Sequence, residues 1–168
     1  QVEKYALALP LLKHNRIVTA KTLGKNHHQY AILCNNLAEL YVRMEDYDKA
    51  LELYFEAKEI YKATLGEADV NYRLIIYNLG NVFYKYGMQL EQKGDLENAI
   101  TSLEKSLGQY ERALSMDKEE DDTNHNYQFV KKELKRLHEI QKQQQQQQQN
   151  QNQKSDQSKE ENQQQSQN

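Results

Sequence analysis

The sequence has little of what crosslinks or interrupts a chain. Its 168 residues include one cysteine (Cys34), one proline (Pro10), six glycines and no tryptophan. A single cysteine excludes an internal disulfide framework and a zinc site built from several cysteines, and it fits a reducing compartment. The scarcity of proline and glycine leaves few turns for a multi-stranded sheet. These shortages predict long helices and an all-α fold.

Charge and apolar runs give no sign of nucleic acid or a membrane as a partner. The formal net charge is -3, so no basic surface is indicated that would neutralise a phosphate backbone. The longest apolar run near the start, from Tyr5 to Leu12, is too short to cross a bilayer. The chain begins at Gln1 and not at methionine, which indicates a fragment of a longer protein.

Motifs for catalysis and cofactor binding are also missing. None of the five histidines has the HExxH spacing of zinc peptidases, and no glycine-rich loop follows a strand to hold phosphate. Cys34 could serve as a nucleophile, but it lies on an apolar stripe three residues before Leu37, where a small buried side chain is expected. We therefore expect no metal, no cofactor and no enzyme activity.

The sequence repeats itself at an interval of 42 residues. A shift of 42 places aligns identical residues along the whole period, among them Tyr5 with Tyr47, Ala8 with Ala50, Leu11 with Leu53, Gly24 with Gly66, Asn36 with Asn78 and Leu37 with Leu79. A fixed period of this length is typical of stacked units that cannot bury their apolar faces alone.

Each unit has the pattern of two helices. Apolar residues from Tyr30 to Tyr41 keep to one helical stripe, and a second stripe starts at Tyr47. Between them, Asp46 is a predicted N-cap, because its carboxylate can accept hydrogen bonds from free backbone amides. Gly66 supplies the left-handed conformation that ends the second helix. Small residues that let the two helices approach closely are Ala38, Ala50 and Ala57.

The following unit is longer by one heptad. Leu79-Gly80-x2-Phe83 is repeated seven residues later as Tyr86-Gly87-x2-Leu90. Seven residues are almost two helical turns, so the insertion lengthens the helix and keeps its buried face in place. The pattern predicts one long helix from about Asn71 to Lys93, in which the two glycines permit close contact with a neighbour.

These residues resemble a known family. The pattern Cys34-x2-Leu37-Ala38-x2-Tyr41, followed by Ala50-x3-Tyr54 and Ala57, is similar to the tetratricopeptide repeat. The chain also resembles the longer repeats of kinesin light chains and nephrocystin-3-like proteins. The resemblance lies in the 42-residue period and in two segments, Thr22-Leu23-Gly24-Lys25-Asn26-His27 and Asn35-Asn36-Leu37-Ala38-Glu39-Leu40-Tyr41. The resemblance implies a right-handed solenoid of antiparallel helix pairs that works in the cytoplasm, in cargo or cytoskeletal adaptors.

The sequence predicts four regions in order. Residues 1–116 form the repeats: a half repeat (1–23), a repeat (30–64) and an extended repeat (71–116). An acidic linker (117–124) leads to a C-terminal helix (125–142). The 3-4 spacing of Tyr127, Val130, Leu134 and Leu137 suits a helix that caps the array, or alternatively a short coiled coil. A glutamine- and asparagine-rich tail (143–168) has no apolar residue, so we expect it to be disordered.

The candidate binding residues are polar ones on the first helix of each unit. Asn36, Glu39 and Arg43 lie one turn apart along one edge, and Asn78, Asn81 and Lys85 repeat the arrangement. The resemblance implies that first helices line a concave groove, in which asparagines at these places hold a peptide backbone. With their neighbours, the candidate set is Asn35, Asn36, Glu39, Arg43, Tyr77, Asn78, Asn81 and Lys85.

Alternatives to this groove stay open. Arg43 and Lys85 favour an acidic partner segment, whereas Asn36 and Asn78 could simply bond between neighbouring helices. A clamp for a C-terminal carboxylate is not expected. Tetratricopeptide domains that clasp a carboxylate resemble each other in a lysine one residue before the repeat asparagine and an asparagine three residues after it. This sequence has Asn35 and Glu39 at those two places. We predict a non-catalytic module that binds a protein or peptide. The alternatives are an end segment of a longer array that self-associates, and a regulatory arm of an enzyme or receptor outside this sequence.

Overall fold

A computed structural model describes the backbone of residues 2–117 and 120–165, with side chains for residues 5, 7–117 and 120–151. All regular structure in these residues is helical: α1 (Val2–Thr22), α2 (His28–Arg43), α3 (Tyr47–Thr64), α4 (Val70–Gln92), α5 (Leu96–Met116) and α6 (Asp121–Gln165). The predicted all-α fold is confirmed.

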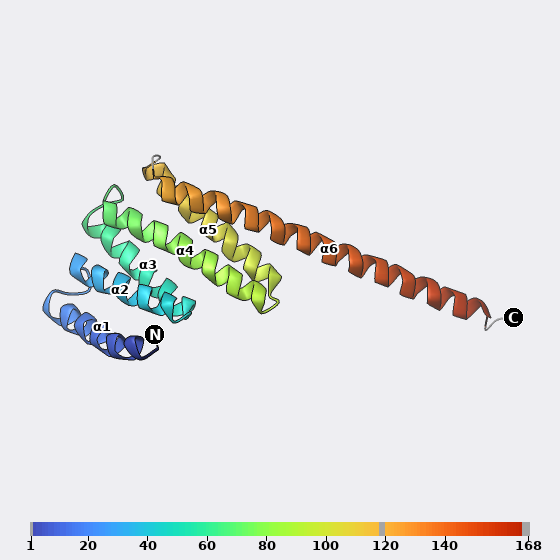
Figure 1. Cartoon of the computed structure of the whole chain (residues 1–168), viewed down its shortest axis with the longest axis horizontal. Helices are drawn as coiled ribbons and strands as arrows, with labels where there is room; N and C mark the ends of the chain where they lie inside the picture. Colours follow the sequence, from blue (N-terminus) through green and yellow to red (C-terminus); the bar gives the residue numbers. More distant parts are fainter. Residues whose placement is uncertain (1, 118–119, 166–168) are drawn as a thin grey trace.

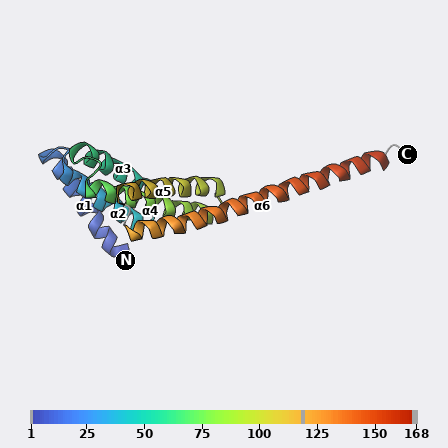
Figure 2. The same ribbon diagram turned by 90° about the horizontal axis from the view of Figure 1, so that it is seen from above.

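The helices stack in chain order, each against the next (Figure 1). The most extensive contacts join α2 to α3 and α4 to α5, which are the two helix pairs expected from the repeat. One apolar core runs through α2, α3 and α4, and a second joins α4, α5 and α6. Seen from above, α6 projects as a rod beyond the other helices (Figure 2).

The turns between helices follow the predicted chemistry. Asp46 caps α3 by accepting a hydrogen bond from the amide of Lys49, and Asp69 and Asp95 cap α4 and α5 in the same manner. Gly66 has φ +87°, in the left-handed region that an L side chain rarely adopts. Because each turn satisfies its free backbone groups locally, the helix pairs begin and end at fixed positions.

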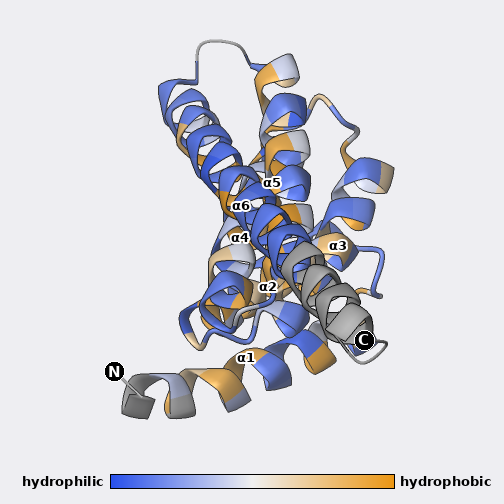
Figure 3. Cartoon of the chain, turned by 90° about the vertical axis from the view of Figure 1, so that its right-hand side faces the viewer, coloured by the Kyte–Doolittle hydropathy of each residue, from blue (hydrophilic) through white to orange (hydrophobic). Residues whose placement is uncertain are grey.

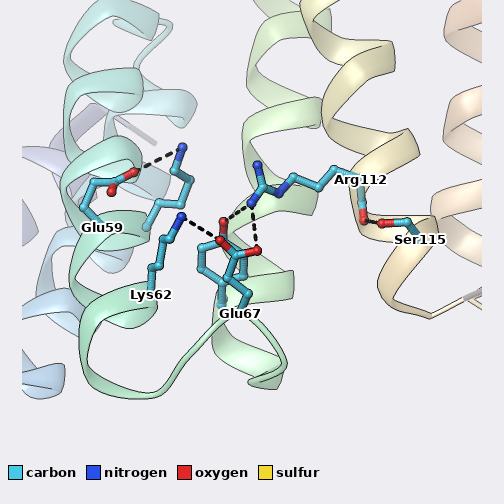
Figure 4. A network of polar contacts seen from close by, with 7 residues as sticks. Glu59, Lys62, Glu67, Arg112 and Ser115 are labelled. Atoms are coloured by element: carbon cyan, nitrogen blue, oxygen red, sulfur yellow. Dashed lines mark hydrogen bonds and ion pairs between the residues drawn. The ribbon is translucent and has the colours of Figure 1, made fainter.

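The loop between α3 and α4 is also held from outside (Figure 4). Its Glu67 accepts from Lys62 of α3 at 2.6 Å and from Arg112 of α5 at 3.1 Å. Arg112 donates in addition to the hydroxyl of buried Tyr72 on α4, at 2.7 Å. The two ion pairs are half exposed and therefore worth little individually, but together they connect three helices at one end of the stack.

The small residues lie where the helices meet. Ala38, Ala50 and Ala57 are completely buried, and so is Cys34. Burial raises the pKa of the Cys34 thiol to about 12, with the nearby Glu56 carboxylate as the next cause. The thiol is therefore protonated at neutral pH, and the interpretation of Cys34 as a core residue is confirmed.

Helix α4 has the predicted extended length, 23 residues. A Cβ on Gly80 would come within 2.6 Å of the Tyr110 ring of α5, and one on Gly87 within 2.2 Å of Leu103. Ser106 of α5 donates to the carbonyl oxygen of Gly80 at 2.7 Å. The two glycines thus allow the close contact between α4 and α5 that the sequence predicted.

The C-terminal region differs from the prediction in its bounds. Helix α6 begins at Asp121, inside the predicted acidic linker 117–124, and the backbone stays helical through most of the predicted disordered tail 143–168, as far as Gln165. Glutamine has a favourable helix propensity, and no proline or glycine interrupts residues 143–165. A helix already formed by residues 121–142 can be extended without a new nucleation step. The end of the predicted tail, 166–168, lies outside the described residues.

The start of α6 is fixed by ion pairs as well as packing. Arg73 of α4 pairs with Asp117 and with Glu120, the latter at 3.4 Å. Of the four residues with 3-4 spacing, Val130 and Leu137 are buried against α4 and α5, and Tyr127 and Leu134 are partly buried. These residues pack against the chain's own helices, which is the capping role predicted for this helix and not the coiled coil.

The first helix contains a proline. A proline inside a helix removes one backbone hydrogen bond and normally disrupts the helix, but α1 runs from Val2 to Thr22 with Pro10 inside. Pro10 is exposed, so water can solvate the carbonyl group that loses its hydrogen bond.

Replacement of Gly80 tests the close contact between α4 and α5. We expect Gly80→Ala to lower the free energy of unfolding by about 1–3 kcal/mol, because the Tyr110 ring has to move. The matched control is Gly108→Ala on α5, where nothing lies within 4 Å of the added Cβ; it should gain up to about 1 kcal/mol from helix propensity. Urea unfolding measures both, and equal stability of the two variants would contradict the close contact.

Candidate partner-binding groove

A groove lies between the first helices α2 and α4. Two adjacent cavities form it, of ≈ 200 and ≈ 420 Å³, and they share Val42, Arg43 and Lys85. The remaining lining residues of the two cavities are Glu39, Glu45, Tyr47, Tyr54, Asn78, Asn81, Val82, Tyr84, Met88, Gln89 and Gln92. We call this surface the α2–α4 groove. Its lining mixes apolar and aromatic side chains with charged and amide groups.

The structure places the eight predicted site residues on these two helices. Asn35, Asn36, Glu39 and Arg43 belong to α2, and Tyr77, Asn78, Asn81 and Lys85 belong to α4. Among the described residues that line the groove are five of them: Glu39, Arg43, Asn78, Asn81 and Lys85.

The asparagines of the set differ in how they are used. Asn78 donates from its amide to the amide oxygen of Asn35 at 3.2 Å, which joins α4 to α2. Asn35 in turn donates to Glu39 at 3.1 Å. Asn36 is exposed, and its amide oxygen accepts from Asn35 at 3.3 Å. Asn78 is therefore committed to a contact between helices, while Asn36 is exposed and lies outside the two cavities of the groove.

Tyr77 and Asn81 contact α6. Asn126 of α6 donates to the Tyr77 hydroxyl at 3.0 Å and to the Asn81 amide oxygen at 3.3 Å. Asn81 also accepts from the hydroxyl of Tyr110 at 2.6 Å. Asn126 was not predictable from the sequence, since α6 has no counterpart in the 42-residue repeat and no periodic signal marks its polar residues.

The cations of the groove are free of ion pairs. Arg43 and Lys85 are exposed, and neither forms a salt bridge or hydrogen bond with any residue whose side chain the structure describes. They lie beside the apolar side chains of Val42 and Val82. The carboxylates of Glu39 and Glu45 also line the groove, so the positive charge is confined to the space next to Arg43 and Lys85. An acidic group placed between these two cations would meet positive charge while its neighbours covered apolar surface.

Helix α6 is held to α4 beyond the groove by a bidentate ion pair. The Arg136 guanidinium donates to the two carboxylate oxygens of Glu91 at 2.7 and 2.8 Å, and to Glu133 at 2.8 Å. Its hydrogen bonds hold the pKa of Glu91 below the usual range. Nearby, Tyr84 of α4 and Phe129 of α6 meet edge to face, with ring centroids 5.7 Å apart.

Acid should weaken this attachment. Since the folded protein lowers the pKa of Glu91, the pair stabilises the fold above the ordinary pKa of a glutamate, about 4.3, and is lost as the pH falls through the lower folded-state value. We expect the melting temperature to drop less between pH 7 and pH 3 in Glu91→Gln than in the unmodified chain.

The control for this measurement is Glu139→Gln. Glu139 is an exposed residue of α6 that forms no ion pair with the described residues. Its replacement should leave the pH dependence unchanged. An unchanged acid response of Glu91→Gln would mean that the pair does not hold α6.

Within the part of the chain that the structure describes, no three histidine, cysteine, aspartate or glutamate side chains gather in a way that could hold a metal ion. None of the helices in that part combines the length and the apolar character needed to cross a bilayer.

The matches to known families agree with this geometry. Residues 1–63 and 32–89 match a family model described as tetratricopeptide repeat, and residues 80–111 match a second model of the same description. These matches span more than half of the chain. The chain therefore belongs to the tetratricopeptide repeat family.

One similar protein is the Clustered mitochondria protein homolog of Candida albicans, which is 31% identical over 106 residues. The aligned part covers 63% of this chain, and the chain spans only 8% of the length of that protein. A similar solved structure is BtubC (BKLC) from P. vanneervenii, with a TM-score of 0.51, 16% identity, and coverage of 83% of this chain and 59% of that one. At this identity the likeness concerns the fold alone, and it agrees with the helical solenoid. The narrower resemblance to kinesin light chains and nephrocystin-3-like proteins stays a prediction.

Proposed function

We propose that this chain is a non-catalytic scaffold that binds an acidic segment of a partner protein in the α2–α4 groove. Tetratricopeptide repeats generally mediate protein–protein interactions, and the proposal names the surface and the charge of the partner. The observation that carries it is the pair of unpaired cations, Arg43 and Lys85, beside apolar Val42 and Val82.

The amide groups along α2 support the same proposal. An extended peptide needs partners that both donate and accept hydrogen bonds, and a carboxamide does both. Asn36 is exposed on α2 one turn before Glu39, outside the two cavities, whereas Asn78 keeps the groove wall in place through its bond to Asn35. In this arrangement Arg43 and Lys85 select for acidic side chains, and Asn36 contacts the backbone of the peptide where it extends beyond the cavities.

The place of action is also a proposal. The similarity to a protein named for clustered mitochondria supports work in the cytoplasm, as part of an adaptor that contacts organelles or the cytoskeleton. The much greater length of that protein leaves room for an enzyme or receptor that uses these repeats as a regulatory arm.

Charge reversal tests the groove. We expect Arg43→Glu/Lys85→Glu to weaken binding of a fluorescein-labelled ten-residue peptide of alternating glutamate and leucine by about tenfold or more, because two attractions become repulsions. Fluorescence polarisation gives the dissociation constants, and the unmodified complex should weaken as salt is added.

The matched control is Lys25→Glu/Lys132→Glu. It makes the same change in net charge at two exposed residues outside the groove. Its affinity should stay close to that of the unmodified chain. If both double variants lose affinity equally, only the overall charge matters and the groove is not the site.

Self-association is a second candidate function, and one observation favours it. Leu11 of α1 is 61% exposed, while Leu53, its counterpart one repeat later, is 7% exposed because α3 packs on α2. Val18 and its counterpart Ile60 differ likewise, at 43% and 8%. The exposed side of α1 is therefore apolar at positions where α3, its counterpart one repeat later, is covered by other helices. Hydrophobic stretches are visible along α1 in Figure 3.

Sedimentation tests this second function. If the α1 surface joins two copies, the unmodified chain should form dimers that Leu11→Glu/Val18→Glu converts to monomers, since a buried unpaired carboxylate is costly. Leu74→Glu, at an exposed leucine of α4, is the control and should leave the dimers intact. A monomer at every concentration of the unmodified chain would exclude self-association through α1.

A further inference from the structure

The outward side of α1 carries a stripe of exposed residues at alternating intervals of four and three. The stripe consists of Leu7, Leu11, His14, Val18 and Lys21. This spacing keeps the five side chains on one face of the helix, and it is the spacing at which two helices pack along a seam. We call this surface the α1 stripe. Helix α1 lies at one edge of the stack (Figures 1 and 3), so the stripe is open to another molecule.

The equivalent stripe of α3 is covered by a helix. Its first four residues, 42 places after those of α1, are Lys49, Leu53, Glu56 and Ile60. Leu53 and Ile60 are buried in the core that α2 shares with α3, and Glu56 accepts a hydrogen bond from the Tyr30 hydroxyl of α2 at 2.9 Å. In α1, by contrast, Leu7 is 78% exposed and no helix lies over the stripe. The α1 stripe therefore resembles a surface that receives a helix in the next repeat, without a helix on it.

The opposite end of the stack is closed by α6. Val130 and Leu137 of α6 are buried against α4 and α5. Apart from Phe129, which lies against Tyr84, the exposed residues of α6 between 121 and 142 are all polar. That end offers no apolar surface to the α1 stripe of a second copy, so copies do not add end to end in a row. Contact through the stripe joins α1 to α1 and stops at two copies.

The α1 stripe is nearly symmetric about its middle residue, His14. Leu11 and Val18 stand three and four residues from it, and Leu7 and Lys21 stand seven residues from it on either side. When two such helices lie antiparallel across a two-fold axis at His14, Leu11 of each copy faces Val18 of the other. The methylene stem of Lys21 then covers Leu7 of the other copy. The axis brings the two His14 side chains together between apolar neighbours.

No carboxylate is available to neutralise His14 when it is protonated. The sequence has no aspartate or glutamate between Glu3 and Glu39. The nearest cations on α1, Lys13 and Arg16, contact the inner helices: Lys13 lies over the Tyr41 ring of α2, and Arg16 pairs with Glu56 of α3. These titratable groups of α2 and α3 lie on the side of α1 away from the stripe.

Histidine is the side chain that changes its charge close to neutral pH. Two neutral imidazoles can pack on the axis, and one can donate a hydrogen bond to the other. Two protonated imidazoles repel each other there and lose hydration among apolar side chains. A contact between two α1 stripes is therefore sensitive to mild acid.

We propose that two copies of this chain join through antiparallel α1 helices with His14 at the two-fold axis, as a dimer that forms at neutral pH and dissociates in mild acid. The proposal rests on the second candidate function, self-association through α1, and adds the geometry and the regulation of that contact. It leaves the α2–α4 groove of each copy free, because the groove lies on other helices.

Cysteine crosslinking tests the geometry. The native Cys34 is fully buried and does not compete. We expect copper phenanthroline to link His14→Cys into a disulfide dimer at neutral pH, because the two thiols meet on the axis. Lys21→Cys, the matched control on the same stripe, should stay unlinked, since 14 residues of antiparallel helix separate its two thiols by about 21 Å. A mixture of Leu7→Cys and Lys21→Cys chains should link, and non-reducing gels show each product.

Crosslinking has two outcomes that overturn the proposed geometry. Absence of a linked His14→Cys dimer means that residue 14 does not lie on a two-fold axis. Equal linking of His14→Cys and Lys21→Cys means that the helices are parallel or collide at random.

Sedimentation equilibrium at pH 8 and pH 5.5 tests the regulation. We expect the dimer of the unmodified chain to have a dissociation constant about tenfold or more higher at the lower pH. The isoelectric point of the sequence, about 6.0, lies in this range, and a small net charge by itself favours association. Dissociation in acid would therefore report local charge on the axis. His14→Leu should give a tighter dimer that is the same at both pH values, whereas His125→Leu, at an exposed histidine of α6, should keep the pH dependence.

The outcomes separate this inference from the function on which it rests. A dimer whose stability does not change with pH, or an acid response that persists in His14→Leu, overturns the inference and leaves self-association through α1 in place. A monomer at every concentration and both pH values overturns the two together.

Discussion

Neighbouring helices in this protein meet across residues that have little or no side chain. Ala50 and Ala57 of α3 are fully buried against α2, and Gly80 of α4 faces the Tyr110 ring of α5 with no room for a methyl group. Large residues beside these positions, such as Tyr54, fill the remaining space. The alternation of small and large residues sets the distance and register of each pair, and every surface of the stack follows from it.

The position of each possible binding surface depends on that register. Because α2 is shared by two interfaces, one of its edges forms the α2–α4 groove, and Leu37 and Tyr41 on the opposite side line a cavity between α1 and α3. Asn78 shows how closely binding and packing are connected, since its amide joins the two helices that form the groove. A polar residue on a first helix can therefore hold the groove together or contact a ligand, and its hydrogen bonds distinguish the two roles.

The sequence allowed prediction of the parts of the fold that are local or repeated. The cap at Asp46, the left-handed Gly66 and the length of α4 depend on short patterns, so they were predictable to within a residue or two. The length of α6 was not predictable in this way. A tail without apolar residues is expected to be disordered, but extending a helix that already exists costs little free energy. Contacts between distant residues without a repeat counterpart, such as Asn126 with Tyr77, leave no pattern in the sequence.

The candidate site was predictable in a similar way. All eight predicted residues lie on the two expected helices, because the repeat fixed which helix each belongs to. The prediction could not determine which of them contact solvent, since this depends on the side chains that approach from neighbouring helices, as Asn78 does with Asn35 and Asn126 of α6 with Tyr77. The cavity between α1 and α3 also escaped prediction, because its lining combines side chains from α1, α2 and α3.

The heptad inserted in α4 has a consequence for the shape of the stack. Helices α4 and α5 contain 23 and 21 residues, against 16 and 18 in α2 and α3. The seven further residues of α4 make it about 10 Å longer than α2, so its last turns overhang the end of α2. Leu90 and Glu91 lie on this overhang, and there they meet the later turns of α6. The insertion thus gives α4 an additional surface, against which α6, a helix longer than any of the repeat helices, packs.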